Sequence, residues 1–596
     1  MIYKKIIMNT TIYHERSNIS FLAWVLVFCA ISCSSRDDNE NTGGAHDAVL
    51  TVKVSGIIDT QNSPTVIAST SKNDKVISVQ SSFEKEVMAY GKDFDALLST
   101  EIPQESPKKN DRIASINVKN ITPIAATSPI ATNINFRILL YDESGINLLK
   151  NVVAKAGTNP NISIDADVKY KWVALSINDT SVPDVSNGQL KAGDISNQDL
   201  LYAAGNLDAK GGQNNLDIVF QRKTTRFDVD IDTRGIFGPI NTFTSLQLGT
   251  GSGSGYKTLL NTADFDVLTG NFGAIQAMAN NNTAVHLMDK NPSTTGNLVK
   301  TVTLYSIIPS GTNVDPNNLT IQPQFILTLD QAISYPPIGP AYAVRNYGNS
   351  NTYFTFKNPA FSIAQGNQYR LSSRMIETPV VVGGTSWARS DLWYDSRSES
   401  IDKYRFKADA AITPMTSEYW NWMATTPSGT PGSGDPCLLV YPAGTWRMPT
   451  GNELIALSNR SSYIFAGYSS GNPPPEDTYY NRIFINQAWN PDTSIATAGN
   501  YSVYSDKVLF GFNGYRQQNN TIVQSRNILN PSIASSSQTV SMNYWSGTAN
   551  GTTATAITQS SNVTIYSNGS HSSSYQNRSS VNTNQNLGLS VRCVRS

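Results

Sequence analysis

The stretch that decides how this chain is interpreted lies near its end, at residues 444–454, and reads Gly-Thr-Trp-Arg-Met-Pro-Thr-Gly-Asn-Glu-Leu. Within it, Thr450 is followed three residues later by Glu453, which is the spacing of a capping box at the start of a helix. We expect that helix to run on through Leu457. Trp446 is a large side chain that we expect to be buried, with its indole N–H hydrogen-bonded.

Two cysteines bracket this stretch. Cys437 precedes it, within Asp-Pro-Cys, and Cys593 comes close to the end of the sequence. In an oxidising compartment, cysteines at the two ends of a domain predict a disulfide staple. In the chain-entropy model, a loop of this length removes on the order of 4–5 kcal/mol of unfolded-state entropy. The alternative is a reactive thiol pair, which the absence of a nearby histidine disfavours.

The blocks in and around this stretch, taken in order, resemble the Fibrobacter major paralogous domain of secreted Bacteroidetes proteins. The matching residues are Trp387-Ala388, Asp435-Pro436-Cys437, Trp446 to Glu453, Gly514-Tyr515-Arg516, Tyr544-Trp545-Ser546 and Val591-Arg592-Cys593. The resemblance implies a C-type-lectin-like fold of mixed α+β type, related to the formylglycine-generating enzyme scaffold. We assign this domain to residues 384–596. The resemblance does not by itself imply an activity.

Composition sets the broad class of protein. Lys+Arg and Asp+Glu both number 45, so the charge balance does not favour nucleic acid or an acidic substrate as partner. Charged residues make up only 15% of the chain and apolar residues 39%. This profile is typical of an extracellular, β-rich protein rather than of a disordered chain.

The N-terminal segment predicts export. An apolar run from Phe21 to Ser32 is too short for a permanent transmembrane helix. Its end, Ala-Ile-Ser-Cys at 30–33, resembles a bacterial lipobox, so we assign residues 1–33 to a lipoprotein signal peptide. Cys33 would carry the lipid that anchors the precursor to a membrane, and residues 34–46 would form a flexible tether. The alternative is an ordinary signal peptide with an incidental cysteine.

The region between the tether and the terminal domain predicts β-sandwiches. Short apolar strands alternate with turns rich in Asn, Gly and Pro, and their order resembles the fimbrillin family of Bacteroidales pili. The residues that carry this resemblance are Leu140-Tyr141-Asp142, Tyr170, Trp172-Val173-Ala174, Leu200-Leu201-Tyr202 and the segment from Gln221 to Val229. The resemblance implies two tandem transthyretin-like β-sandwiches, at 47–225 and 226–383. The complete expectation is a mainly β chain that ends in the α+β domain.

Candidate ligand contacts come from the aromatic residues of the terminal domain, since flat rings stack on sugars. The candidates are Trp420, Trp422, Tyr479, Tyr480 and Trp489. The alternative is that most of them are core residues. The four histidines are scattered and lack metal-ligand spacing, and no catalytic motif stands out. We therefore expect no metal, cofactor or catalytic residues, although a carboxylate pair stays open.

The two resemblances together predict a tip or accessory fimbrial adhesin at the outer membrane and cell surface. Its lectin-like head would bind a glycan or a surface protein, and its partners would be other fimbrial subunits joined by donor-strand exchange. In the fimbrillin family a protease cuts after a basic residue and the first strand leaves its groove. Arg112 is our candidate cut site, in competition with Lys72 and Lys75.

The position in the filament follows from the C-terminal residues. Only three residues follow Cys593, which are too few to make a donor strand, so we expect a subunit at the filament tip. The alternatives are a surface glycan-binding lipoprotein outside any pilus and a glycan-active enzyme.

Overall fold

The structure is a computed structural model of the 596-residue chain. It describes residues 47–58, 87–89, 94–101, 127–236, 239–278, 287–289, 298–308, 319–328, 333–335, 339–341, 344–347, 353–356, 363–396, 400–407, 418–458, 462–467, 479–484, 508–523, 536–565, 571–575 and 578–596. Within these ranges the fold is mainly β with one α-helix, α2 (Gly451–Ser458), as the composition predicts. The transthyretin-like topology and the C-type-lectin-like fold stay predictions.

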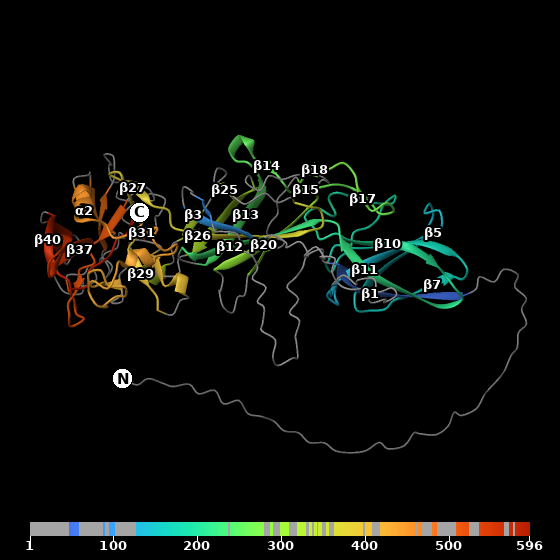
Figure 1. Ribbon diagram of the computed structural model, residues 1–596, viewed down its shortest axis with the longest axis horizontal. Coiled ribbons are helices and arrows are strands. Elements are labelled where there is room, and N and C mark those ends of the chain that lie inside the picture. The colour runs from blue at the N-terminus through green and yellow to red at the C-terminus, as the bar shows by residue number, and fades with distance from the viewer. Residues whose placement is uncertain are drawn as a thin grey trace, which may run out of the picture. The chain divides into compact units, whose positions relative to one another are not determined.

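The first sheet contains eight strands in the order β4-β1-β11-β10-β8-β5-β6, with β7 also paired to β1 (Figure 1). Their bounds are β1 Asp47–Ile58, β4 Thr127–Ser128, β5 Asn135–Asp142, β6 Leu148–Lys155, β7 Asn161–Asp165, β8 Lys169–Ser176, β10 Leu201–Asp208 and β11 Gly212–Arg222. Strand β1 runs parallel to β11, whereas its pairing with β7 and β4 is antiparallel.

Strand β5 shows why this sheet needs two apolar layers. Its sequence Phe-Arg-Ile-Leu-Leu-Tyr is apolar at nearly every position, and a continuous apolar run predicts a strand buried on both faces. Phe136 and Ile138 join one core together with residues of β1 and β11. Leu139 and Tyr141, on the opposite face, pack in a separate cluster that includes Phe265. This face of the first sheet is therefore covered partly by chain from beyond residue 225.

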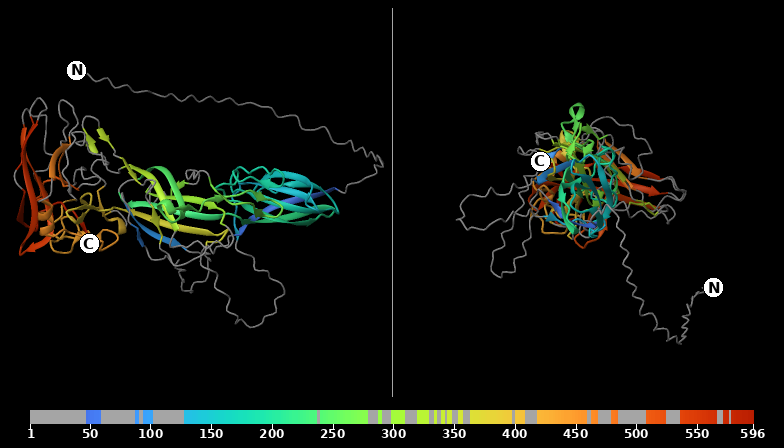
Figure 2. Two further views of the ribbon diagram at one scale, coloured as in Figure 1. Left: turned by 90° about the horizontal axis from the view of Figure 1, so that it is seen from above. Right: turned by 90° about the vertical axis from the view of Figure 1, so that its right-hand side faces the viewer.

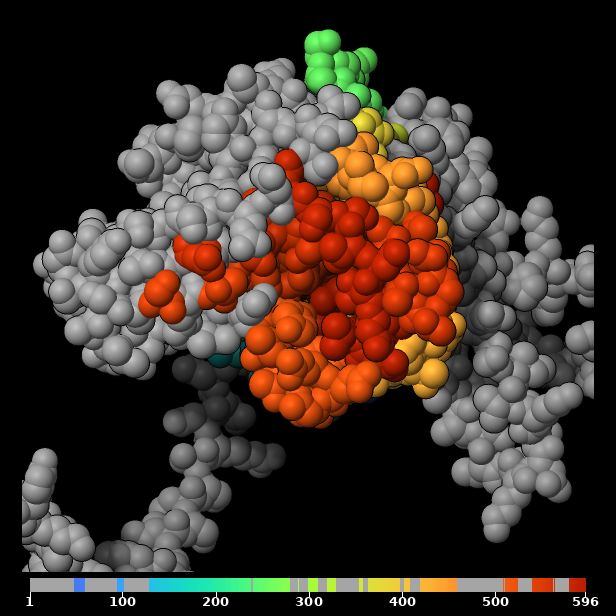
Figure 3. All heavy atoms as spheres, turned by 90° about the vertical axis from the view of Figure 1, so that its left-hand side faces the viewer, coloured from blue at the N-terminus to red at the C-terminus, as the bar shows by residue number. Residues whose placement is uncertain are grey.

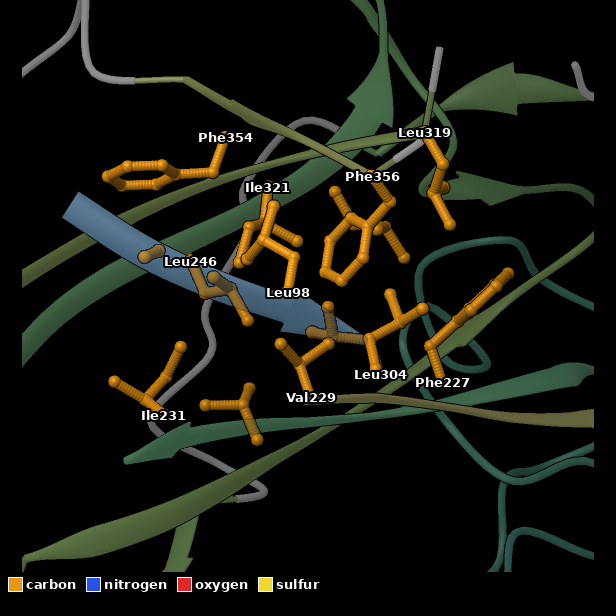
Figure 4. Close-up of a cluster of buried hydrophobic side chains, with 14 of the residues drawn as sticks. Leu98, Phe227, Val229, Ile231, Leu246, Leu304, Leu319, Ile321, Phe354 and Phe356 are labelled. Carbon is orange, nitrogen blue, oxygen red and sulfur yellow. The ribbon is translucent and has the colours of Figure 1, made fainter. Parts of the chain in front are cut away.

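The second sandwich packs a six-stranded sheet, β19-β20-β12-β26-β3-β2, with a five-stranded sheet, β14-β13-β21-β24 plus β25 on β21. The bounds in the six-stranded sheet are β2 Val87–Ala89, β3 Asp95–Glu101, β12 Thr225–Gly235, β19 Leu287–Asp289, β20 Val299–Ser306 and β26 Gln368–Ile376. Those in the five-stranded sheet are β13 Ile240–Thr250, β14 Lys257–Thr258, β21 Leu319–Thr328, β24 Val344–Tyr347 and β25 Phe354–Thr355. Figure 4 shows the core between them, where Phe227, Val229 and Ile231 of β12 point toward side chains of β21 and β25.

Apolar and polar residues alternate along Phe227–Ile231 of β12, but the polar face is not open to water. Asp228 and Asp230 are as buried as the apolar residues between them. Asp228 accepts hydrogen bonds from Thr303 and Gln368, and Arg226 forms an ion pair with it. Burying a carboxylate is tolerated only with such partners, so the sequence pattern alone understated how deep this strand lies.

The expected boundary at 225/226 needs a correction, because strands cross it in both directions. β2 and β3 fall within 47–225 in sequence but lie in the second sheet, where β3 pairs with β26. Figure 1 shows β1 beside β11 and β3 beside β26, and the left view of Figure 2 shows the two blue-coloured strands well apart. Conversely, β9 (Gln189–Leu190) pairs with β16 (Phe265–Asp266). The first sheet and the second sandwich therefore do not correspond to consecutive stretches of sequence, since strand pairing depends on long-range partners and not on chain order.

The terminal module is built around a four-stranded sheet, β27-β28-β41-β31. Its strands are β27 Val380–Val382, β28 Thr385–Trp387, β31 Trp446–Arg447 and β41 Val594–Arg595. The hairpin of β37 (Ser536–Asn550) and β38 (Thr553–Ile565) extends the module, and β38 also pairs with β39 (His571–Tyr575) and β40 (Ser579–Asn584). The expected boundary at 383/384 falls inside the β27–β28 turn, so the module includes β27.

The remaining described strands are short. They are β15 Asn261–Thr262, β17 Asn271–Phe272, β18 Gln276–Ala277, β22 Ile333–Tyr335, β23 Gly339–Ala341, β29 Leu392–Tyr394, β30 Tyr404–Phe406, β32 Ser462–Gly467, β33 Tyr479–Phe484, β34 Val508–Gly511, β35 Tyr515–Arg516 and β36 Ile522–Val523. No helix in the ranges given above is long and apolar enough to cross a membrane.

Candidate functional site

Strand β1 pairs with β11, β7 and β4, which are all remote from it in sequence. We call the position between these strands the seat of β1. Its inward residues Ala48, Leu50, Val52 and Ile57 are all buried, whereas Lys53 on the other face is exposed. Ten residue pairs join β1 to β11, and five join it to β7. The alternating apolar side chains give the seat its specificity for a strand of this register.

A bulge interrupts the seat near its end. The register with β11 shifts between Val54 and Gly56. Gly56 has a φ of 147°, a conformation that side-chain-bearing residues rarely adopt. A strand that replaced β1 in this seat would need a glycine or a shorter pairing at this point.

A cavity of about 650 Å³ continues from the end of β1. Ile58, the last residue of β1, lines it together with Lys223, Phe272 and Ile307. Burial lowers the pKa of Lys223, whose ammonium donates to the Gly270 carbonyl at 3.0 Å.

The candidate stacking aromatics of the terminal module separate into core and surface residues. Trp420 is fully buried, so the expectation that it stacks on a ligand is wrong. It exchanges two backbone hydrogen bonds with Leu589, which fixes it inside the module. Tyr479 and Tyr480 lie in β33, but their side chains lie outside the described part of the chain, as does the whole of Trp489.

Trp422 is the one candidate that the structure leaves half-buried. Its indole nitrogen donates to the Ser546 carbonyl at 2.8 Å, and its backbone is bonded to Gln585 and Gly432. The ring is therefore held in one orientation at the surface by strand β37. A fixed aromatic ring of this kind can stack on an apolar face without a further loss of side-chain entropy.

The helix start has the geometry that the capping box predicts. The Thr450 hydroxyl accepts from the Glu453 amide at 3.2 Å, and the Glu453 carboxylate accepts from the Thr450 amide at 2.7 Å. Arg447 forms two further hydrogen bonds to the same carboxylate. These bonds hold the pKa of Glu453 below its usual value. The burial predicted for Trp446 is confirmed.

A disulfide joins Cys437 to Cys593, with a Cα–Cα distance of 5.8 Å. Both cysteines lie in an apolar cluster with Trp420, Trp446 and Trp545. Beside Cys437, Asp435 accepts from the backbone amides of Cys437 and Met448, both at 2.8 Å, while burial raises its pKa. Asp435 and the disulfide together connect the segment before helix α2 to the segment around Cys593.

Sequence reasoning missed a buried polar network centred on Asp391. Arg592, which is fully buried, donates twice to Oδ1 of Asp391, at 2.6 and 3.0 Å. Asn513 and Tyr544 donate to Oδ2. The only sequence signal was the charge of Arg592 next to Cys593. Both carboxylate oxygens of Asp391 are hydrogen-bonded inside the protein, so the network stabilises the fold.

The remaining predicted sites lie outside the described residues. They are the lipidation site Cys33, the cut-site candidate Arg112 and its competitors Lys72 and Lys75. Within the described ranges, no group of three or more His, Cys, Asp or Glu side chains could hold a metal ion.

The faces of the terminal module differ in their exposed segments. Figure 3 shows the face formed by the last strands, where residues near the C-terminus (red) occupy the middle and orange segments flank them. Strand β40 contributes exposed Ser and Asn side chains, at 579, 580, 582 and 584. Such a polar, uncharged face is suited to hydrogen bonding with a neutral ligand.

Comparison with known proteins gives a limited result. No family model matches the chain, and no curated protein matches it. Neither family resemblance that the sequence suggests is therefore supported by a family match.

Three solved structures are similar to parts of the chain. A candidate cell adhesion protein from Bacteroides fragilis is 10% identical, with 55% of this chain and 92% of that chain covered and a TM-score of 0.26. The fimbrial anchor protein from Porphyromonas gingivalis is 12% identical, with 39% and 95% covered and a TM-score of 0.20. A fimbrial assembly protein from Parabacteroides distasonis is 10% identical, with 41% and 85% covered and a TM-score of 0.18. At these TM-scores the likeness carries no conclusion about this chain.

Proposed function

We propose that this protein is an exported surface adhesin that joins a fimbrial filament. Its first sandwich accepts a strand of a neighbouring subunit in place of β1, and its terminal module presents a ligand-binding face. The precursor is anchored to a membrane by lipid on Cys33. The terminal module binds a glycan or a surface protein.

The observation that carries this proposal is the way in which β1 is held. Its sheet neighbours are β11, β7 and β4, none of which follows it directly in the described chain. The next described strands, β2 and β3, belong to another sheet. Among the strands that the structure describes, β1 therefore has no hairpin partner. It can leave its seat without unravelling a hairpin, and another extended segment can take its place by β-strand addition.

The end of the described chain supports a head rather than a donor role for the terminal module. Strand β41 is paired on both sides, with β28 and β31, and Cys593 is bonded to Cys437. The backbone N–H of Ser596 also donates to Thr445. Residues held in this way are not free to enter a neighbour's groove. In this fold β41 is therefore not available as a donor strand, and we keep the tip of the filament as the proposed position.

The proposal is tested by locating the terminal module on intact cells. Gold-labelled antibodies against residues 386–596 should mark filament ends, and sheared filaments should contain the protein. Uniform labelling along the shaft contradicts the distal position. A protein that stays wholly in the membrane fraction after shearing supports the second candidate, a lipoprotein outside any filament.

The lipid anchor has its own test. Replacing Cys33 by Ala should abolish metabolic labelling with palmitate and prevent normal surface delivery. A Ser32→Ala variant is the matched control, because it leaves the acceptor thiol in place. Unchanged palmitate labelling in the Cys33 variant contradicts the lipobox.

A further inference from the structure

The segment between β1 and β4 contributes a strand to a sheet in which neither of these strands takes part. Strand β3 is antiparallel to β26 over seven residue pairs, and β2 covers its other edge with three pairs. Strands β1 and β4, which flank this segment in sequence, pair with each other in the first sheet. The chain therefore leaves the first sandwich, supplies a strand to the second and returns.

Strand β3 fills a position in the second core. Phe94, which precedes it, is fully buried, and its ring centroid lies 5.6 Å from that of Phe325 and 5.1 Å from that of Phe354. Ala96 and Leu98 continue the same apolar face. Figure 4 shows Leu98, on the blue strand, among side chains from the facing sheet. Without β3 this core would be open along the edge of β26.

The opposite face of β3 is held by the terminal module. Asp95 is buried and forms an ion pair with Arg595 of β41. The same guanidinium donates to the Glu377 carbonyl at 3.0 Å and lies over the ring of Trp446. Removing one member of a buried ion pair leaves the other charge without compensation. Strand β3 is thus fixed to the second sandwich on one face and to the terminal module on the other.

We infer that β3 is a donor strand supplied in cis, which closes the second sandwich and stays in the mature subunit when β1 is exchanged. This inference rests on the proposed exchange at β1. Because β3 stays paired with β26, the edge of β26 is closed to other subunits. The seat of β1 is then the position that accepts a strand from a neighbour. The incoming partner is an extended segment whose alternate apolar side chains match those of Ala48, Leu50 and Val52.

The inference also changes the preferred cut site from Arg112 to Lys72 or Lys75. A cut at Arg112 falls between β3 and β4 in sequence, so the released piece would carry both β1 and β3 and would open both sandwiches. Lys72 and Lys75 fall between β1 and β2, and a cut there frees β1 alone. A cut that leaves β2 and β3 in the second sandwich therefore lies on the N-terminal side of Val87.

The test compares two full-length variants by hydrogen exchange and mass spectrometry. In one, residues 47–58 are replaced by a Gly-Ser segment of equal length, and in the other residues 87–101 are replaced in the same way. Backbone amides of β26 should keep their protection in the first variant. In the second they should exchange at least about tenfold faster, because local opening no longer requires breaking the β3 pairing. A synthetic peptide of residues 87–101 should restore the protection.

Point substitutions cover the case in which the second variant does not fold. Asp95→Asn and Leu98→Ala should each speed exchange in β26, whereas Leu50→Ala on β1 should not. Unchanged β26 protection in the replacement of 87–101, or in both β3 substitutions, overturns the inference.

A labelled peptide of residues 47–58 separates the two proposals. The variant without β1 should bind it. If that variant binds no peptide while loss of β3 still exposes β26, the exchange at β1 is wrong and the assignment of β3 stands.

Discussion

Removing the Cys437–Cys593 disulfide should strongly destabilise the terminal module. The bond closes a loop with a sequence separation of 156 residues. In the chain-entropy model, a loop of this size corresponds to about 5 kcal/mol at 25 °C, as an upper value for the free energy of unfolding. For a unit of this size, each kcal/mol shifts Tm by roughly 2–4 °C. The double variant Cys437→Ala, Cys593→Ala should therefore melt about 10–20 °C below the unmodified protein.

Tryptophan fluorescence is a suitable probe of this change. Seven of the nine tryptophans lie after residue 383, so the signal reports mainly on the terminal module. Trp420, Trp446 and Trp545 are in the same cluster as the disulfide and fully or almost fully buried. Melting curves should be recorded for the exported protein and the double variant, each with and without reductant.

The controls test whether loss of the Cys437–Cys593 disulfide causes the lower Tm. Reductant should lower the Tm of the unmodified protein toward that of the double variant and should leave the double variant unchanged. Equal Tm values for the two oxidised proteins, within about 2 °C, would refute the argument. So would peptide mapping that finds both thiols free in exported protein.

Three further predictions concern the terminal module. Arg447 holds the pKa of Glu453 below its usual 4.5, so this ion pair stabilises the fold above that pH and the contribution is lost as the pH falls through the lowered pKa. Glu453→Gln should thus be less stable than the unmodified protein at pH 7, but the difference, measured by urea unfolding, should vanish in acid. Arg592→Met should cost about 3–5 kcal/mol because Asp391 is left buried without its cation, and the cost should shrink when Asp391→Asn is added. Trp422→Ala should reduce binding on a glycan array at least about tenfold, and equal binding would remove this ring from the site.

The fold class was predictable because its signals are local. Alternating strands and turn residues are sufficient to predict a β-rich chain, and the three-residue spacing from Thr450 to Glu453 correctly predicted the capped helix start. Burial of Trp446 also followed from its size. In each case the deciding residues are neighbours in sequence.

The predictions that were wrong concern contacts between residues far apart in the chain. Nothing local to Asp95 shows that its strand pairs with β26 or that its carboxylate meets Arg595, which is 500 residues away. The contiguous domain boundaries were therefore wrong at β3. Trp420 and Trp422 illustrate the same limit within the candidate site. They stand two residues apart in a segment without regular periodicity, so sequence could not show that only Trp422 reaches the surface.

The most direct test of the central claim asks which strand occupies the seat of β1 in assembled material. Asp217 of β11 is exposed and pairs with Lys53 of β1, so a photo-crosslinking amino acid at this position reports on the occupant. The same amino acid at Val153 of the edge strand β6 is the matched control. In sheared surface filaments, mass spectrometry should find position 217 linked to a peptide from another polypeptide chain. Crosslinks solely to residues 47–58 of the same chain would contradict strand exchange.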